Sequence, residues 1–590
     1  MRKSRHKTDL NIKPEVTREF IWELNRVIKA HAKAFWPDDL DYNSDLSAYQ
    51  RKHGLLDSHV TACHYLQRNF LSKYYDAEGG TSPAERRTRA IVKWLGVEQR
   101  NARTNRRIVS SSNDTRHVTE DGTPIYMWDV LFRARRICFR IIGDGHDVDL
   151  FNGGMTSGAS TSKRRSVDTL SLKFTEKMDA TDRLREYLPK LGEKYTGWST
   201  LAPQAFDDAR VVSGNILFTV PKNAEIDRVA CKEPDLNLFC QKSLGGVIRR
   251  ALRKRAQIDL NDQTRNQQLA QRAYKHKLCT IDLSSASDSM TIELVRAIVP
   301  PRWFELLSLV RSPVTIIDGE EHVNNMFSSM GNGATFELES LIFYCLAKAV
   351  SELEGFKIPT GSVIGVFGDD LIINRSASAL LIKVLGFCGF KTNVDKTFIE
   401  GPIFESCGKH YCADYDVSPF FIRHNFSDVS DLILTLNQLR GWMIRTGVDL
   451  HETYAEDKPQ YTFYGVWKKY CNLVPRSLHG GWDLTSRVQL VTPGQYRCRL
   501  EPVMIQKRGV AGTYQLGMYL ARLRQLDLGT DRSDLEAETM ETSEFPSIQT
   551  NEWEIRRFKD TASFFGIATE PLHQEMKVTV VVNPIDTKEV

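Results

Sequence analysis

Residues 362–374 read SVIGVFGDDLIIN, two short apolar runs on either side of Gly368 and Asp369. Such runs predict a β-hairpin with a tight turn, because glycine accepts backbone angles that other residues resist. The turn would present Asp369 and Asp370 at the tip of a buried hairpin. Two like charges in an apolar setting are costly unless a cation neutralises them, and Mg²⁺ prefers carboxylate and phosphate oxygens. An ordinary acidic turn is the alternative that this stretch alone leaves open.

Residues 278–288 read LCTIDLSSASD, an apolar strand that ends in Asp282 and is followed by a turn of small residues. A helix is expected from Ser289 towards Val299, where two prolines follow. An Asp at the end of one strand can meet a hairpin Asp pair on a neighbouring strand. Three such carboxylates hold two divalent metals roughly 3.5–4 Å apart for in-line phosphoryl transfer. We therefore predict that Asp282, Asp369 and Asp370 are catalytic residues and metal ligands.

Residues 328–337 read SSMGNGATFE and lead into a long apolar stretch of helical character. Small residues let a nucleotide approach the backbone closely, and an asparagine amide offers both a donor and an acceptor. Ser329, Gly331 and Asn332 are therefore predicted to bind the nucleotide. The alternative is a glycine turn before a helix, which is a common arrangement.

Two further stretches supply cations. Residues 219–234, TVPKNAEIDRVACKEP, contain Lys222, Arg228 and Lys232, which together suit a triphosphate because that group needs fixed positive charges. In the stretch 389–397, GFKTNVDKT, Lys396 is predicted to protonate the leaving pyrophosphate as a general acid. Read alone, either stretch is equally a strand and turn with surface lysines.

Asp288 and Asn332 are predicted to distinguish ribose from deoxyribose. The ribose 2′-hydroxyl both donates and accepts, and it is the group that marks RNA. A carboxylate can accept its proton, and an amide can donate to its oxygen. The competing interpretation is that Asp288 caps the helix that follows, since Asp is favoured at such positions.

The bulk composition describes a globular protein of several subdomains. The chain has 590 residues, of which 41% are hydrophobic and 26% are charged. No apolar run approaches the roughly 18 residues needed to span a bilayer, and the basic first residues are not followed by the apolar segment of a secretory signal. We therefore expect a cytoplasmic protein with no membrane association.

The charge distribution indicates nucleic-acid binding more clearly than the net charge does. The net charge is only +5, from 79 basic and 74 acidic residues. Basic residues cluster at 249–255, at 103–107 and at 163–165, and such patches attract phosphate through counterion release. A solvated helix face is the alternative for any single patch.

The 11 cysteines are odd in number and irregularly spaced, which argues against a disulfide framework. Cys407, His410 and Cys412 lie close together in the sequence and raise the possibility of zinc. No second ligand pair follows at a finger-like spacing. Packed core thiols are therefore the preferred interpretation.

Helical periodicity is expected over residues 16–32, 85–95, 430–444 and 514–526. The segment 151–163 is rich in Gly, Ser and Thr and is expected to be a loop. Residues 531–554 are strongly acidic, so we expect a surface loop or flap that avoids RNA. Residues 577–582 are expected to form a late strand.

The motifs lie along the chain at 222–233, 282–288, 329–333, 368–370, 396 and 405–411. In that order they resemble the motifs of palm-type RNA-directed RNA polymerases. The resemblance is closer to one family, the replicase catalytic beta subunit of single-stranded RNA bacteriophages (leviviruses). It is carried by the strings VPKN at 220–223, IDLNDQ at 258–263, DLSSASDS at 282–289, SMGNG at 329–333, FELESLIF at 336–343 and ESCGKH at 405–410. The strong resemblance covers roughly residues 210–425. One departure is Phe367, where the family usually has Tyr before Gly-Asp-Asp; the ring is expected to pack beneath the turn.

The resemblance implies an α+β fold, a right-handed polymerase with palm, fingers and thumb and an antiparallel palm sheet. The expected regions are a helical segment at 1–110 that bridges fingers and thumb, mainly fingers at 111–269, the palm at 270–430, and the thumb with the C-terminal region at 431–590. It implies two Mg²⁺ ions, for which Mn²⁺ can substitute, with template RNA, product RNA and nucleoside triphosphates as ligands. It also implies host elongation factors Tu and Ts and a ribosomal small-subunit protein as partners, in the cytoplasm of the infected bacterium.

Two other functions compete with an RNA polymerase. A reverse transcriptase also uses a hairpin Asp pair, but it is expected to have a bulky residue where the 2′-hydroxyl sits, whereas this chain has the small or polar Ser287, Asp288 and Asn332. A non-enzymatic RNA-binding virion protein would explain the basic patches. It would not explain three carboxylates in these strand contexts.

Overall fold

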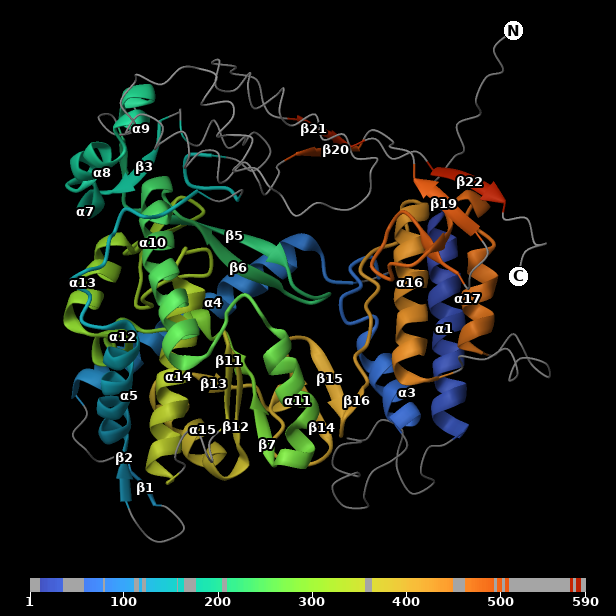
Figure 1. Ribbon diagram of the computed structural model, residues 1–590, viewed down its shortest axis with the longest axis horizontal. Coiled ribbons are helices and arrows are strands. Elements are labelled where there is room, and N and C mark those ends of the chain that lie inside the picture. Colours follow the sequence, from blue (N-terminus) through green and yellow to red (C-terminus); the bar gives the residue numbers. More distant parts are fainter. Residues whose placement is uncertain are drawn as a thin grey trace.

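The computed structural model describes a mixed α and β chain whose strands form several small sheets surrounded by helices (Figure 1). The described residues are 11–34, 58–77, 80–110, 116–118, 124–155, 158–163, 174, 177–203, 209–355, 363–448, 462–492, 496–500, 505–508, 573–576 and 580–584. The predicted α+β class is confirmed at this level. No helix within these ranges is long and apolar enough to cross a membrane.

A three-stranded antiparallel sheet lies in the middle of the molecule, in the order β11-β12-β7. Its strands are β7 (Leu278–Ile281), β11 (Ile364–Phe367) and β12 (Asp370–Asn374). Helices α11 (Thr264–His276), α14 (Thr335–Leu353) and α15 (Ser378–Phe387) pack around it.

Both faces of this sheet are covered. Successive side chains of a strand point to opposite faces, and along β12 Leu371 and Ile373 enter the large core that includes α14. Ile372 between them packs instead with Ala270 and Ala273 of α11. The continuous apolar run on each side of the Asp pair thus buries the hairpin on both faces.

A second sheet of order β10-β9-β5-β6 lies beside the first and carries the predicted cation stretch. It contains β5 (Gly214–Pro221), β6 (Asp227–Lys232), β9 (Val314–Ile317) and β10 (Glu320–Val323). Helix α4 (Pro83–Ser110) packs against it. This helix starts with a capping box, in which the Ser82 Oγ accepts from the Glu85 N–H and the Glu85 carboxylate accepts from the Ser82 N–H.

Helices from an early and a late part of the chain meet in a second core. Helices α1 (Pro14–Ala34) and α3 (Ser58–Asn69) pack with α16 (Val429–Thr446) and α17 (Phe463–Cys471) in a bundle at the right of Figure 1. Their apolar residues form a cluster separate from the one around the central sheet. Segments more than 350 residues apart in the chain therefore depend on each other for burial.

The remaining elements complete the surroundings of these two cores. The other helices are α5 (Met127–Ile142), α7 (Asp182–Arg185), α8 (Leu188–Lys194), α9 (Thr196–Leu201), α10 (Asp235–Ala251), α12 (Ile292–Ile298) and α13 (Pro301–Val310). The other strands are β1 (Arg116–Val118), β2 (Pro124–Tyr126), β3 (Asp179–Thr181), β4 (Arg210–Val212), β8 (Leu283–Ser284), β13 (Lys391–Thr392), β14 (Ile403–Ser406), β15 (Lys409–Cys412), β16 (Tyr415–Asp416), β17 (His479–Gly481), β18 (Leu490–Val491), β19 (Tyr496–Leu500), β20 (Ile505–Arg508), β21 (His573–Met576) and β22 (Val580–Pro584).

The expected helices at 16–32 and 430–444 are confirmed by α1 and α16, and the one at 85–95 is part of the longer α4. The helix expected from Ser289 was placed too early, because α12 begins at Ile292 after a short 3₁₀ turn. The described parts of 151–163 contain neither helix nor strand, as expected. The segments 514–526 and 531–554 lie outside the described residues, and of the strand expected at 577–582 only 580–582 are described, within β22.

Helix α4 is tied to the centre of the molecule by the buried carboxylate of Glu98, which is 1% exposed. It accepts hydrogen bonds from the backbone N–H groups of Asn325 at 2.6 Å and Met326 at 2.9 Å, and from the Asn101 amide at 2.8 Å. Its second partner side chain is His322, whose Nε2 lies 3.1 Å away. Glu98 thus helps to hold the segment that leads to the predicted nucleotide loop, together with Arg311, which donates to the Met326 and Phe327 carbonyls.

We predict that Glu98→Ala lowers the free energy of unfolding by roughly 3 kcal/mol or more, because two N–H groups lose their acceptor and each such loss costs about 1–3 kcal/mol. Denaturant unfolding of the complete chain measures this change. The control is Glu320→Ala at an exposed position of β10, where the expected change is within about 0.5 kcal/mol. If the two substitutions lower the free energy of unfolding equally, Glu98 does not have the stabilising role described above.

Candidate functional site

The turn of the β11–β12 hairpin has the geometry that its sequence predicts. Phe367 pairs with Asp370, so Gly368 and Asp369 are the two central residues of the turn. Gly368 has φ of +60°, and a Cβ there would lie 2.8 Å from the Phe336 ring of α14. Its N–H donates to the Ser340 Oγ at 3.0 Å. Helix α14 therefore supports the turn from below and admits only glycine at this position without displacement.

The strand register brings the predicted carboxylates together. Leu371 of β12 pairs with Ile281 of β7 in antiparallel fashion, so the next position outward sets Asp370 opposite Asp282. Side chains of directly opposed residues lie on the same face of a sheet, with Cβ atoms about 4.5–5.5 Å apart. The sheet thus gathers Asp282, Asp369 and Asp370 at one edge, as expected from the sequence.

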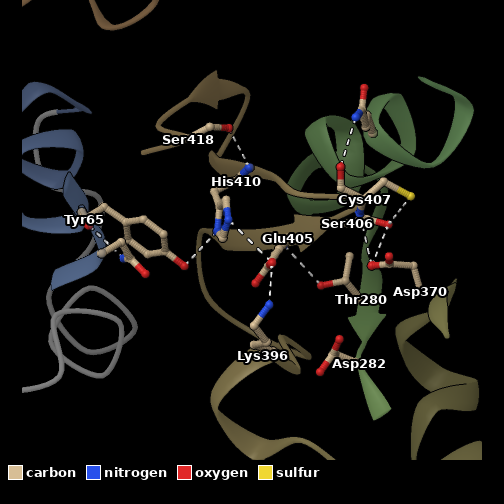
Figure 2. A network of polar contacts seen from close by, with 12 residues as sticks. Tyr65, Thr280, Asp282, Asp370, Lys396, Glu405, Ser406, Cys407, His410 and Ser418 are labelled. Atoms are coloured by element: carbon tan, nitrogen blue, oxygen red, sulfur yellow. Dashed lines mark hydrogen bonds and ion pairs between the residues drawn. The ribbon is translucent and has the colours of Figure 1, made fainter. Parts of the chain in front are cut away.

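Two of these carboxylates are oriented by neighbours that come from later in the chain. The Asp282 Oδ2 accepts from the Asn393 side-chain amide at 2.7 Å. The Asp370 Oδ1 accepts from the Cys407 N–H at 3.1 Å and from the Ser406 hydroxyl at 3.3 Å (Figure 2). Each carboxylate keeps a second oxygen that can bind another group.

Burial raises the pKa of all three carboxyl groups. For Asp370 burial is the main cause and the Asp369 and Asp282 charges add to it, so that its pKa reaches about 7. Burial also raises the pKa of Asp282 and Asp369. Groups that are costly to ionise beside one another suit a multivalent cation, because the cation offsets both the desolvation and the repulsion.

The donor set is therefore chemically suited to divalent cations such as Mg²⁺, which take carboxylate oxygens. Within the described ranges, however, no three acidic, His or Cys side chains already converge as closely as metal ligands do. Asp282 is turned towards Asn393, and Asp370 is turned towards the β14–β15 loop. A rotation of these side chains would be needed to share an ion.

Cations face the carboxylates from the neighbouring sheet. The charges of Arg228, Lys222 and Lys396 all lower the pKa of Asp369, against the dominant effect of burial. Partial burial and then the neighbouring cations Arg228 and Lys93 lower the pKa of Lys222. Neither Lys222 nor Arg228 has an ion-pair partner among the described residues, so both remain available to an anionic ligand. Lys232, in contrast, lies 5.6 Å from the centre of the Phe218 ring.

Lys396 lies on the other side of Asp282, in a short 3₁₀ turn at 394–396. Its Nζ donates to the Glu405 Oε1 at 2.9 Å (Figure 2). Burial lowers the pKa of Lys396, but the Glu405 charge and hydrogen bond, with the charges of Asp282 and Asp370, outweigh it and the net shift is upward. The ammonium is therefore fully protonated at neutral pH.

Asp288 is not the cap of the following helix, so that interpretation was wrong. The cap is Thr291, whose hydroxyl accepts from the Leu294 N–H. The Asp288 Oδ1 is buried and has no hydrogen-bond partner in the described part of the chain. Burial, followed by the charge of Glu98, raises the pKa of Asp288 to about 7. An unsatisfied buried acceptor of this kind suits a ligand that donates a hydrogen bond.

The loop with Ser329, Gly331 and Asn332 lies against β6. Gly331 is exposed with φ of +115°, and a Cβ there would lie 2.1 Å from the Cys231 carbonyl oxygen. The Asn332 Oδ1 accepts from the Ala334 N–H at 2.9 Å. The Ser329 hydroxyl is buried and bonded to Asn215 and Glu233, so this hydroxyl supports the loop from within.

The structure also tests the predictions made for Phe367, for the cysteines near residue 410 and for the basic patch at 249–255. The Phe367 ring packs edge-on against Phe336 at 5.1 Å between ring centres, as expected for a ring beneath the turn. Cys412 is buried, as expected for a packed core thiol, whereas Cys407 is only half-buried. The basic patch at 249–255 is partly structural, because Arg249 pairs with Glu337 at 2.7 Å.

Other residues of the site were not singled out from the sequence. They are Lys73, Lys93, Glu339 and Asn393, together with Glu405 and His410 in the roles described here. Burial, followed by the Asp369 charge, raises the pKa of Glu339 to about 8, so this buried carboxyl lies close to the turn. Glu339, Asn393, Glu405 and His410 lie within stretches that the sequence analysis quotes, but the residue types alone did not indicate their contacts.

The chain is similar to known proteins over most of its length. A family model described as RNA replicase, beta-chain, matches residues 29–562. The chain is 37% identical over 467 residues to the RNA-directed RNA polymerase beta chain of Enterobacteria phage fr, covering 77% of this chain and 81% of the relative. It is 36% identical over 437 residues to that of Escherichia phage MS2, covering 73% and 76%.

A further relative is the RNA-directed RNA polymerase subunit beta of Escherichia virus Qbeta, 38% identical over 420 residues and covering 70% of this chain and 66% of the relative. Among solved structures, an RNA-dependent RNA polymerase of BmCPV at its elongation state matches at 9% identity and a TM-score of 0.34, covering 80% of this chain and 39% of that one. That structural likeness is too distant to support an argument. The chain belongs to the RNA replicase beta-chain family and is an RNA-directed RNA polymerase, an enzyme that makes RNA from an RNA template.

Proposed function

We propose that this polymerase joins ribonucleotides by a two-metal mechanism centred on Asp282, Asp369 and Asp370. The observation that carries the proposal is the β7–β12 register, which sets Asp370 opposite Asp282 at the edge where Asp369 is also buried. Two Mg²⁺ ions, or Mn²⁺ in their place, would activate the 3′-hydroxyl of the growing RNA and neutralise the leaving pyrophosphate. The three aspartates would hold them.

The chain's other residues act on the substrate around that centre. Lys222 and Arg228 hold the triphosphate of the incoming nucleotide, since both are unpaired cations that face Asp369. Gly331 lets the nucleotide approach the loop backbone, and Asn332 presents its amide nitrogen. Ser329 braces that loop from inside. Lys396 carries the proton for the pyrophosphate, because its ammonium is charged and directed to the same region as Asp282.

We propose the regions of a right-handed polymerase by the resemblance, with support from the two cores. The central β11-β12-β7 sheet with its helices corresponds to a palm over 270–430, and the segment 111–269 contributes mainly to fingers. The bundle of α16 and α17 corresponds to a thumb over 431–590. Helices α1 and α3 pack on that bundle while α4 packs on the second sheet, which supports the proposal that 1–110 bridges fingers and thumb.

The polymerase acts on template and product RNA with nucleoside triphosphates as substrates. By resemblance we propose that host elongation factors Tu and Ts and a ribosomal small-subunit protein join it in the cytoplasm of the infected bacterium. Co-purification from infected cells tests these partners, and a chain that purifies without them while fully active would contradict the proposal.

We predict that Asp369→Asn abolishes RNA synthesis without unfolding the chain, because it removes one charge at the turn with little change in size. Single-nucleotide extension of a primed RNA in Mg²⁺ measures the loss, and a Mg²⁺-dependent rise in melting temperature should shrink in parallel. Asp414→Asn, at an exposed position, is the matched control. Wild-type extension by Asp369→Asn would disprove the metal assignment.

We predict that Arg228→Ala raises the Michaelis constant for nucleotides roughly tenfold, the equivalent of about 1.4 kcal/mol, and leaves RNA affinity unchanged. The effect is modest because Arg228 is exposed and its charge is screened by water. Lys222→Ala is expected to act in the same way. Arg272→Ala, an exposed arginine on α11, serves as the control; an unaltered nucleotide constant in Arg228→Ala would rule out the clamp.

We predict that Asp288→Ala and Asn332→Ala narrow the preference for ribonucleotides over deoxyribonucleotides. A site built to pair a hydroxyl leaves buried polar groups unsatisfied when the hydroxyl is missing, and the Asp288 Oδ1 is such a group. The measurement is single-nucleotide incorporation with each sugar. Thr291→Ala removes the true helix cap and should cost about 1 kcal/mol of stability with no change in sugar preference. Unchanged discrimination in both site variants would refute the selection role.

A further inference from the structure

A line of polar contacts leads from helix α3, in the bundle of α1, α3, α16 and α17, to the edge of the central sheet that carries Asp282 and Asp370 (Figure 2). The Tyr65 hydroxyl lies 3.1 Å from the His410 Nδ1, and the His410 Nε2 lies 3.5 Å from the Glu405 Oε1. The same Glu405 oxygen accepts from the Lys396 Nζ at 2.9 Å. Glu405 and His410 are direct partners in the β14–β15 pairing, so the sheet register itself aligns the two side chains.

The protonation states of this line follow from its surroundings. Burial lowers the pKa of His410, against the opposing effect of Glu405, so the imidazole is neutral with one donor and one acceptor. The Glu405 Oε1 lies 3.5 Å from the His410 Nε2, and this contact favours the tautomer with its proton on that nitrogen. The His410 Nδ1 then accepts from the Tyr65 hydroxyl, which keeps its proton because burial raises its pKa. Along the line, Tyr65 therefore donates to His410, and His410 and Lys396 both direct a proton towards the Glu405 carboxylate.

The line ends at Lys396, whose side chain is long and has many rotamers. The side chain of Lys396 is 49% exposed, whereas that of Glu405 is only 11% exposed and that of His410 only 10%. A lysine has four rotatable bonds and loses considerable rotamer freedom when it is held in one place. The buried carboxylate is thus the fixed point and the ammonium is the group that it restrains.

The same hairpin also holds a predicted metal ligand. Ser406 and Cys407, which follow Glu405, donate to the Asp370 carboxylate. The His410 N–H in turn donates to the Ser418 hydroxyl at 2.9 Å, which ties β15 to the segment that follows it. A buried Glu–His–Tyr set contributes little net stability compared with apolar residues of similar size, so stability alone does not account for it.

We propose that Tyr65, His410 and Glu405 are positioning residues that hold the Lys396 ammonium towards the leaving pyrophosphate. This inference rests on the proposed function, in which Lys396 supplies the proton. It adds a physical link from the α3 helix to the chemical step, because the Tyr65 hydroxyl orients the imidazole that orients the carboxylate. The residues act through polar contacts alone, and no covalent bond along the line is made or broken.

The test is a double-mutant cycle with steady-state kinetics of nucleotide incorporation by the complete chain in its active preparation. Glu405→Gln keeps the shape of the side chain and removes its charge. It should lower kcat by about tenfold, part of the roughly 100-fold or more that a general acid contributes, with the nucleotide KM nearly unchanged. Lys396→Met should lower kcat further, and adding Glu405→Gln to it should cause no additional loss.

Tyr65→Phe removes only the hydroxyl and should lower kcat by about threefold, the effect expected for one hydrogen bond. In the Lys396→Met background the same substitution should leave kcat unchanged. Tyr470→Phe is the matched control, since that tyrosine is buried in the same bundle and its hydroxyl has no hydrogen-bond partner among the described residues. Melting temperatures of all variants separate a kinetic effect from unfolding.

The outcomes distinguish this inference from the function on which it rests. If Lys396→Met slows the enzyme but Glu405→Gln lowers kcat by the same factor in both backgrounds, the positioning role is overturned and the proton-donor role survives. If Lys396→Met is as fast as the wild type, the proton-donor role itself is wrong and the positioning role falls with it. Equal kcat in Tyr65→Phe and Tyr470→Phe would end the line at His410 and overturn the part assigned to Tyr65.

Discussion

The pairing of β12 with β7 sets two aspartates opposite each other at the edge of a buried sheet, and a third follows the glycine of the adjoining turn. Like charges so placed repel each other and lose hydration, which is why burial raises the pKa of all three. An apolar hairpin alone would not keep such groups together. Much of the surrounding structure keeps these carboxylates in place, as the contacts to Asp282 and Asp370 show.

Support for this edge comes from below and from the side. Helix α14 supplies the Phe336 ring and the Ser340 hydroxyl under the turn, and Glu337 of the same helix pairs with Arg249 of α10. The β14–β15 hairpin supplies the donors that orient Asp370. Because these contacts come from separate elements, a shift of any one of them would be felt at the carboxylates.

The basic side chains near the three aspartates are of two kinds, those without an ion-pair partner among the described residues and one that is already paired. Lys222 and Arg228 have no ion-pair partner in the described ranges and are therefore free to respond to a ligand. Lys396 is already restrained by Glu405. This difference fits the roles proposed for these residues, since a group that holds a substrate must exchange water for phosphate, whereas a group that delivers a proton benefits from a fixed position.

Much of the central site was determined by the sequence itself. The two apolar runs around Gly368 specify a hairpin, and glycine is required there because φ is positive and the Phe336 ring leaves no room for a Cβ. The strand that precedes Asp282 is equally local in origin, because its mostly apolar residues are buried on both faces of the sheet. These features depend on neighbours along the chain, so periodicity and turn chemistry were enough to predict them.

Only the tertiary structure decided which distant residues complete the site. The cap at Thr291 in place of Asp288 depended on where the 3₁₀ turn ends, which no residue pattern specifies. Tyr65 meets His410 because the bundle of α1, α3, α16 and α17 packs against the β14–β15 hairpin, and their 345-residue separation in the chain carries no local signal. Contacts of this kind arise from the burial of apolar faces, and the polar groups they bring together follow from that packing.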